Sequence, residues 1–204
     1  MQTTNLNIAI LLPDEIVNQS IIMSKKIAKE VGSRFILNSD ALIPHITVYQ
    51  AQYPNKNVNI LKKLVQDLSS RKTFEINLDS VTISHETFLF WKCEKIEILK
   101  ELQARAIEVA NPLREGLVPA QLAKVTGLNE GDRYDAKTFG ELLIGPRYEP
   151  HITIARLKRK EDADKAIRIL GSSRKVSFKP KALILGHLGE HGTVTEIVKS
   201  FRFK

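Results

Sequence analysis

With 204 residues, 43% of them hydrophobic and 26% charged, the chain can bury a sizeable core, and its composition is that of a globular protein rather than a disordered or fibrous one. No apolar run approaches the roughly 18 residues that a membrane span needs, and the first residues lack the basic and apolar stretches of a secretion signal. Cys93 is the only cysteine, which excludes an intrachain disulfide and a four-cysteine metal site, so we expect a cytoplasmic protein.

The first half of the chain predicts strands and helices in alternation. Apolar residues recur at helical spacing before Gly32 and again behind Asn57, which is a suitable N-cap, and Asn111-Pro112 is a helix stop. We expect, in order, a strand at 6–12, a helix at 14–31, a strand at 35–49, a helix at 58–68, two strands within 74–91 and a helix at 94–110.

The second half begins less regularly. Residues 126–148 hold four of the ten glycines without a clear period, which predicts loops. A strand at 148–157 and a helix at 161–170 follow. The pattern then predicts one long hairpin over 175–204 that turns through the glycine-rich segment 186–192.

The tetrapeptide Pro-His-Ile-Thr occurs twice, at residues 44–47 and 150–153. A helix precedes each copy, and another helix and a strand pair opening with Arg-Lys follow it (Arg71-Lys72 and Arg174-Lys175). This repetition predicts an internal duplication. We expect an α+β fold with two lobes related by a pseudo-twofold axis, antiparallel sheets lining a central cleft and helices outside. Residues 1–204 would form a single bilobal domain.

Alternation along a strand separates each copy into two faces. His45 and Thr47 point one way, and His151 and Thr153 do the same in the second copy. The residues on the opposite face are β-branched and expected in the core, namely Ile46, Val48, Ile152 and Ile154. A pseudo-twofold axis that joins the two strands would bring two imidazoles and two hydroxyls together.

This set of side chains suits phosphodiester cleavage without a metal or cofactor. One neutral imidazole can take a proton from the attacking oxygen while the other, as imidazolium, gives a proton to the leaving oxygen. Histidine alone populates both forms near neutrality, so we expect a bell-shaped kcat/KM with its maximum at roughly pH 6–7.5. The threonine hydroxyls can donate hydrogen bonds to phosphate oxygens.

The paired motifs resemble those of the 2H phosphoesterase superfamily, in particular its bacterial and archaeal branch of 2′-5′ RNA ligases and 2′,3′-cyclic phosphodiesterases. Two copies of His-apolar-Thr-apolar carry the resemblance, together with the segment 150–156 (Pro-His-Ile-Thr-Ile-Ala-Arg). It covers most of the chain but not residues 112–148. It implies a bilobal fold, no metal, and action on 2′,3′-cyclic phosphates or 2′-5′ linkages at RNA ends.

Two further residues are candidates for substrate binding. Tyr49 continues the face of His45 and can either stack on a base or pack at the rim. Arg156 matches the arginine of the family and can bind a phosphate, although strict alternation puts it on the core side unless the strand ends or bulges there.

The other three histidines predict no site of their own. His187 and His191 are four residues apart, a metal-ligand spacing on a helix, but they fall in a glycine-rich turn. His85 is expected in a turn.

The net charge of +8 comes entirely from residues 156–204, which hold 13 basic and 5 acidic side chains, since residues 1–155 hold 18 of each. That segment can be a solvated basic face or can attract a polyanion such as RNA. We therefore expect a phosphodiesterase that opens 2′,3′-cyclic phosphates of RNA ends or nucleotides. The alternatives are a 2′-5′ RNA ligase, a phosphodiesterase of 2′-5′ or cyclic oligonucleotides, and a non-catalytic RNA-end binding module. The sequence leaves the oligomeric state open.

Overall fold

The strands form one eight-stranded antiparallel sheet in a computed structural model that describes residues 2–123, 125, 127–171 and 173–204. The order across the sheet is β6-β3-β4-β5-β2-β1-β7-β8. The strands are β1 (Thr3–Leu11), β2 (His45–Pro54), β3 (Ile76–Ser84), β4 (Phe88–Cys93), β5 (His151–Arg156), β6 (Ser173–Phe178), β7 (Ala182–Leu188) and β8 (Val194–Arg202).

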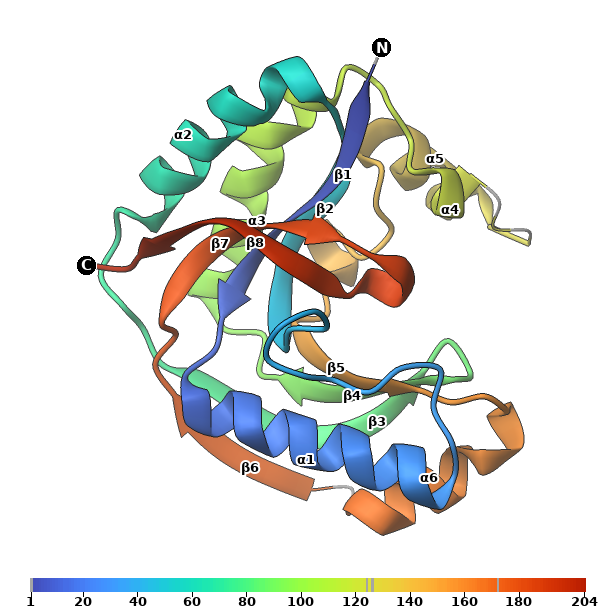
Figure 1. The fold of residues 1–204 in the computed structure, drawn as a ribbon. Helices are drawn as coiled ribbons and strands as arrows, with labels where there is room; N and C mark the ends of the chain where they lie inside the picture. Colours follow the sequence, from blue (N-terminus) through green and yellow to red (C-terminus); the bar gives the residue numbers. More distant parts are fainter. Residues whose placement is uncertain (1, 124, 126, 172) are drawn as a thin grey trace.

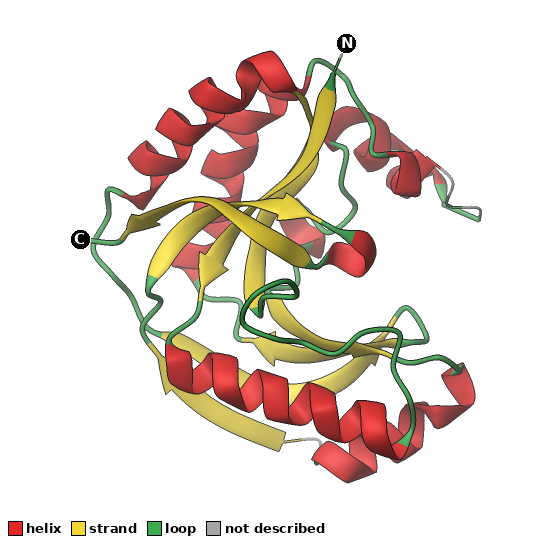
Figure 2. Ribbon diagram, in the orientation of Figure 1, coloured by secondary structure: helices red, strands yellow, loops and turns green. Residues whose placement is uncertain are grey.

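Helices flank the sheet in two groups (Figures 1 and 2). The α-helices are α1 (Asp14–Glu30), α2 (Val58–Ser69), α3 (Glu97–Ala110), α4 (Ala120–Ala123), α5 (Glu130–Phe139) and α6 (Ala163–Leu170). Short 3-10 turns are η1 (Asn55–Asn57), η2 (Asn111–Arg114), η3 (Gly145–Arg147), η4 (Lys160–Asp162) and η5 (Glu190–Gly192). Helices α2 and α3 pack on β2, β7 and β8, whereas α1 and α6 pack on β5 and β3.

The sheet is symmetric about its centre, where β5 and β2 meet. Each of these strands carries one copy of the repeated tetrapeptide at its start, and each is followed outward by three more strands. The α+β fold with two related lobes is therefore confirmed. The lobes are not consecutive halves of the chain, however. One consists of β1, β2, β7, β8, α2 and α3, and the other of β3–β6, α1 and α6, so the chain crosses between them several times.

Most of the expected elements are confirmed, and their local chemistry explains them. Helix α1 begins after Pro13 with Asp14 and Glu15 in its first turn, where acidic side chains favour the positive end of the helix dipole. Gly32 ends it with φ at 86°, a conformation that glycine adopts without strain. His85 lies in the β3–β4 turn, as expected, with a positive φ of 45°.

Two expectations in the first half are wrong. The strand expected at 35–49 begins only at His45. Before it, the Asn38 side chain accepts hydrogen bonds from three backbone amides, those of Asp40, Ala41 and Leu42, and this bends the chain into a loop. Asn57 does not cap α2, because its side-chain amide donates instead to the Leu113 carbonyl, at 2.7 Å.

Two expectations in the second half are also wrong. Residues 126–148 are not all loop, because α5 starts where the Asn129 side chain accepts from the Asp132 amide at 2.8 Å and ends at Gly140, whose φ is 69°. The segment 175–204 is not one hairpin. Strand β6 pairs with β3 at the far edge of the sheet, and only β7 and β8 form the hairpin, through η5.

Of the helices in the described part of the chain, none is long and apolar enough to cross a membrane.

Candidate active site

The two copies of the repeated motif lie side by side at the centre of the sheet. Strands β2 and β5 are paired antiparallel at one position, Ile46 with Ile152, and both isoleucines are fully buried. Val48 and Ile154 are buried too, as expected. Antiparallel pairing places the polar motif residues on the other face of the sheet in two cross-strand pairs, His45 with Thr153 and Thr47 with His151. We call this the motif face.

Both imidazoles are anchored in the same way. Nδ1 of His45 donates to the Ile43 carbonyl at 2.7 Å, and Nδ1 of His151 donates to the Glu149 carbonyl at 2.5 Å. A carbonyl can only accept, so each ring carries its proton on Nδ1 when neutral. Each Nε2 then carries the lone pair that a proton transfer needs, and that of His45 faces the side-chain amide of Asn7.

The surroundings of the two rings differ. Asn7, fully buried on β1, donates its side-chain amide to Thr47 Oγ1 at 2.9 Å, and the same nitrogen lies 3.3 Å from Nε2 of His45. His151 instead stacks on Phe90, with the ring centres 3.5 Å apart and the planes at 17°. One copy is thus supported by an amide and the other by an aromatic ring.

Burial lowers the pKa of both histidines. For His45, desolvation outweighs hydrogen bonding to the Ile43 and Gly192 backbone, which favours the charged form. Desolvation lowers the pKa of His151 to about 4, and the nearby His45 and Lys92 act in the same direction. Both rings are therefore neutral at pH 7 in the free protein.

A β-bulge interrupts each motif strand directly after its threonine. On β2, Thr47 pairs with Ala9 and Tyr49 with the next residue, Ile8, so the register skips one position. On β5, Thr153 pairs with Phe90 and Ala155 with Leu89 in the same pattern. Each bulge turns the chain over, and the alternation that holds within the motif does not continue beyond it.

The bulge decides the position of the two substrate-binding candidates. Tyr49 is turned into the core, where it is 1% exposed and its hydroxyl donates to the Phe139 carbonyl at 2.6 Å. In this position the ring of Tyr49 is not exposed to stack on a base, and it packs in the core rather than at the rim. Arg156 pairs with Phe88 and is brought to the motif face, with its guanidinium carbon 4.8 Å from the centre of that ring.

Arg156 has hydrogen-bonding capacity left over. One terminal nitrogen donates to Nδ1 of His191 at 2.7 Å. Its Nε is buried and has no partner among the described residues. A buried guanidinium N–H without an acceptor is costly, and an anionic ligand would satisfy it.

The remaining histidines do not form a metal site with one another. His187 contacts Thr4 Oγ1 at 3.3 Å, whereas His191 contacts Arg156. Within residues 2–123, 125, 127–171 and 173–204, no three His, Cys, Asp or Glu side chains converge to hold a metal ion. Two cavities, of about 400 Å³ beside α4 and α5 and about 330 Å³ between β3 and β6, contain no motif residue.

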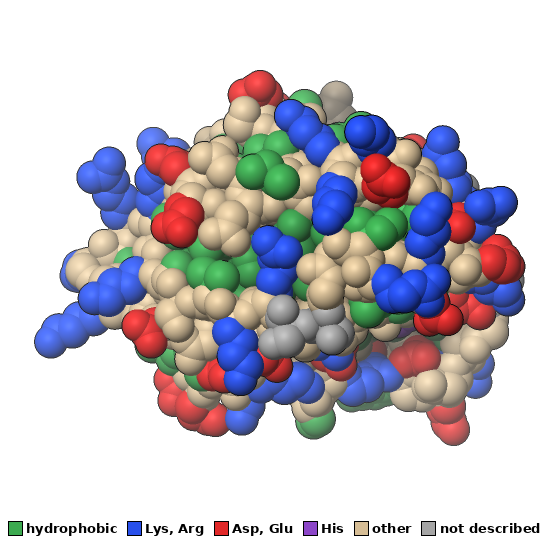
Figure 3. Space-filling model, turned by 90° about the horizontal axis from the view of Figure 1, so that it is seen from below, with side chains coloured by type: hydrophobic (Ala, Val, Ile, Leu, Met, Phe, Trp, Pro, Cys, Tyr) green, Lys and Arg blue, Asp and Glu red, His purple; other side chains and the backbone are tan. Residues whose placement is uncertain are grey.

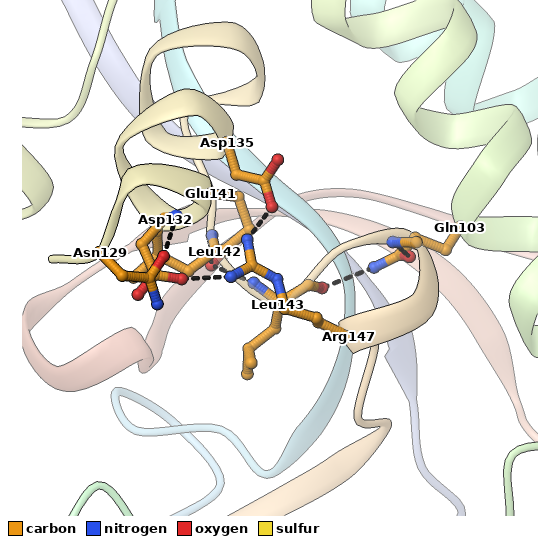
Figure 4. A network of polar contacts seen from close by, with 9 residues as sticks. Gln103, Asn129, Asp132, Asp135, Glu141, Leu142, Leu143 and Arg147 are labelled. Atoms are coloured by element: carbon orange, nitrogen blue, oxygen red, sulfur yellow. Dashed lines mark hydrogen bonds and ion pairs between the residues drawn. The ribbon is translucent and has the colours of Figure 1, made fainter.

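Ion pairs on one side and hydrogen bonds on the other hold the segment between α5 and β5 in place (Figure 4). Arg147 is directed at two carboxylates of α5, Asp132 and Asp135, and forms an ion pair with each. On the other side Gln103 of α3, 3% exposed, donates to the Leu143 carbonyl at 2.9 Å and accepts from the Gly145 amide at 3.0 Å. These contacts fix the residues that lead into His151.

On the face that holds α1 and β6, basic side chains are spread out rather than gathered in one patch. Lys and Arg side chains extend over the whole of this face, with Asp and Glu among them (Figure 3). For this face the interpretation as a solvated surface fits better than a continuous basic stripe.

Comparison with known proteins agrees with the repeated motif. Residues 27–191 match the family model of the 2′-5′ RNA ligase superfamily. The chain belongs to this family. Its members are 2H phosphoesterases, a superfamily of enzymes of phosphoester cleavage or ligation. No curated protein matches the sequence.

Solved structures share the family fold at low sequence identity. TT0787 of Thermus thermophilus is 16% identical, with a TM-score of 0.62 over 98% of this chain and 97% of that one. E. coli LigT complexed with 3′-AMP is 17% identical, with a TM-score of 0.62 over 100% and 99%. LigT has also been crystallised with NADP+, with phosphate and with ATP.

Asn7, Phe90 and His191 touch the candidate site and were not predicted from the sequence. Asn7 could have been found, because it is an amide inside the apolar run of a buried strand. The other two come from strands and turns that only the three-dimensional pairing brings to the motifs.

Proposed function

We propose that this protein is a metal-independent phosphodiesterase that opens 2′,3′-cyclic phosphates at RNA ends or in nucleotides. The observation that carries the proposal is the register of β2 against β5, which sets His45 and His151 diagonally across one face with a threonine beside each. Two anchored imidazoles at this spacing can act on one phosphate from opposite sides.

In the proposed reaction one histidine removes a proton from water as the water oxygen attacks phosphorus. The other histidine donates its proton to the ribose oxygen as the bond between that oxygen and phosphorus breaks. The product is a phosphate monoester with a free neighbouring hydroxyl. Because both rings are neutral in the free protein, the acid has to gain its proton with the anionic substrate, whose charge raises the pKa of an adjacent histidine.

Thr47, Thr153 and Arg156 would hold the phosphate. Thr47 Oγ1 already accepts a hydrogen bond from Asn7, so its own proton is available for a phosphate oxygen. Thr153 lies across from His45, and Arg156 has its buried Nε to offer. Donors aimed at the non-bridging oxygens stabilise the charge that develops in the transition state.

The family leaves a second reaction open. A 2′-5′ RNA ligase, or an enzyme that cleaves 2′-5′ or cyclic oligonucleotides, would use the same pair of histidines. The complexes of E. coli LigT with 3′-AMP, ATP and NADP+ support a nucleotide or RNA ligand in either case.

A panel assay tests the proposal. The pure protein is incubated with 2′,3′-cyclic nucleotides, RNA with a 2′,3′-cyclic end, and 2′-5′ dinucleotides, with and without EDTA. We expect turnover of the cyclic phosphates that EDTA does not reduce. Turnover of the 2′-5′ dinucleotides alone would favour the second reaction, and binding without turnover would favour a non-catalytic module. Activity lost in EDTA and restored by zinc or manganese would contradict the two-histidine mechanism.

A further inference from the structure

One short turn, η5, touches both halves of the candidate site. The Gly192 backbone acts on the ring of His45 in the first motif and favours its charged form, which raises the pKa of that ring. Its neighbour His191 accepts a hydrogen bond from Arg156, which follows the second motif. Directly after the turn, the Val194 carbonyl at the start of β8 accepts from the amide of Ile43, two residues before His45, at 2.9 Å.

Arg156, at the end of β5, is held by two other segments of the chain. Its carbonyl accepts from the Arg34 amide at 2.8 Å and from Ser33 Oγ at 3.1 Å. Its side chain donates to Nδ1 of His191 at 2.7 Å. His191 in turn stacks on Phe35, with ring centres 5.9 Å apart and planes at 24°. The loop before β2 and the turn η5 therefore meet at Arg156, the loop at its carbonyl and the turn at its guanidinium.

The direction of the hydrogen bond defines the state of His191. A guanidinium can only donate, so Nδ1 of His191 must be the acceptor and its proton must lie on Nε2. A doubly protonated ring would place N–H against N–H and two positive charges side by side. The contact therefore exists only while His191 is neutral.

We propose that His191 is a positioning residue that holds the Arg156 guanidinium on the motif face and leaves its Nε–H for a phosphate oxygen of the substrate. The inference rests on the proposed function for the identity of the anion. The β7–β8 turn, which lies outside the paired motifs, would then take part in binding the substrate phosphate.

Two substitutions separate the hydrogen bond from the packing of the ring. In His191→Asn the side-chain oxygen occupies the position of Nδ1, so an acceptor remains, and asparagine tolerates the positive φ of 61° at this site. In His191→Phe the ring can still stack on Phe35 but offers no acceptor. Because the two variants keep complementary halves of the side chain, they serve as controls for each other.

Sulfate binding to the full-length protein, measured by calorimetry at pH 7.5, tests the proposal without any turnover. Sulfate has the tetrahedral shape of the substrate phosphate, is an anion with oxygens that accept hydrogen bonds, and does not titrate near neutrality. We expect His191→Phe to weaken sulfate binding at least about fivefold and His191→Asn to stay within about twofold of the wild type. Equal binding by the wild type and His191→Phe would overturn the proposal. Equal weakening in both variants, or no sulfate binding by the wild type, would do the same.

The pairing of His191 with Arg156 can be checked by NMR titration of the ring nitrogens. The pKa of His191 is lowered by burial first and then by Arg156 and Arg34, with Glu190 opposing them. Arg156→Met should therefore raise the pKa of His191. Arg159→Met is the control and should leave that pKa unchanged, because the exposed Arg159 side chain pairs with Asp162 instead. An unchanged pKa in Arg156→Met would contradict the contact. Since neither readout needs catalysis, a protein inactive on the whole substrate panel would refute the proposed function and still leave this inference decided.

Discussion

At the scale of single residues, the two motif copies have the same sequence but different supports. His45 and Thr47 share the amide of Asn7, and His151 rests on the ring of Phe90. The two strands are placed symmetrically, but His45 has an amide beside Nε2 and His151 has an aromatic ring against its face, so the two imidazoles have different surroundings.

Substitution of Asn7 tests whether its amide contributes to catalysis. In Asn7→Ala, Thr47 loses the donor that directs its hydroxyl proton away from β1. We expect kcat to fall about 10- to 100-fold, with a smaller change in stability, since a hydrogen bond to a catalytic group contributes on the order of 1–3 kcal/mol. Asn5→Ala, two residues earlier on the same strand, is the matched control. A native kcat in Asn7→Ala would remove Asn7 from the mechanism.

Burial of the histidines changes the expected pH dependence. The kcat/KM profile reports the pKa values of the free protein, and both are lowered, that of His151 to about 4. Productive protein, with one ring neutral and one charged, is most abundant between these two values. We therefore expect a maximum below pH 6.5, somewhat lower than the sequence alone predicts, and a decline as the pH rises above it.

The kcat profile should fall at a higher pH than the kcat/KM profile, because the bound anionic phosphate raises the pKa of the acid. Both profiles come from one set of initial rates between pH 4 and 9. A kcat/KM that is flat across this range, or largest above pH 7, would contradict the acid–base assignment.

The sequence predicted the residues of the motif well and their neighbours poorly. Period-two alternation places His45, Thr47, His151 and Thr153 correctly, because all four lie before the bulge. It fails for Tyr49 and leaves Arg156 undecided, because a bulge adds one residue that no local sequence signal marked.

At the scale of elements, periodic apolar spacing predicted α1 and α2 because each buries one stripe against the sheet. Helix α5 was missed because only Ala136 of its ten residues is buried, so it has no stripe to recognise. Its caps, Asn129 and Gly140, were the remaining signal. Tertiary contacts with Gln103 and Arg147, rather than an apolar face, keep the segment that follows α5 in place.

This dependence can be measured by replacing Gln103 with methionine. Gln103→Met keeps the size of the side chain but leaves the Leu143 carbonyl and the Gly145 amide without their partner. We expect the free energy of unfolding in urea to fall by about 1–3 kcal/mol. Amide hydrogen exchange should rise in residues 141–150. Gln66→Met, on the exposed face of α2, should change neither quantity, and unaltered exchange in Gln103→Met would show that the contact does not hold the segment.

At the scale of the whole molecule, the duplication predicted the number of lobes and the neighbourhood of the two motifs. It did not predict that β7 and β8 return to the lobe of β1 and β2 or that α1 joins the other lobe. Sequence symmetry reveals equivalent strands, but the order of pairing depends on long-range contacts that no local pattern records. The return of β7 and β8 to the lobe of β1 and β2 matters for the site, because the turn η5 between them is thereby placed beside both motifs.

The central claim is that His45 and His151 act together on one phosphate, and single and double substitution tests it most directly. The kcat of His45→Ala, His151→Ala and the double variant is measured on a 2′,3′-cyclic nucleotide in EDTA. We predict that each single variant loses roughly 10²–10⁴-fold in kcat and that the double variant is little worse than the worse single one, because groups that act as a unit are not additive. A single variant with near-native kcat, or losses that multiply in the double variant, would contradict the account.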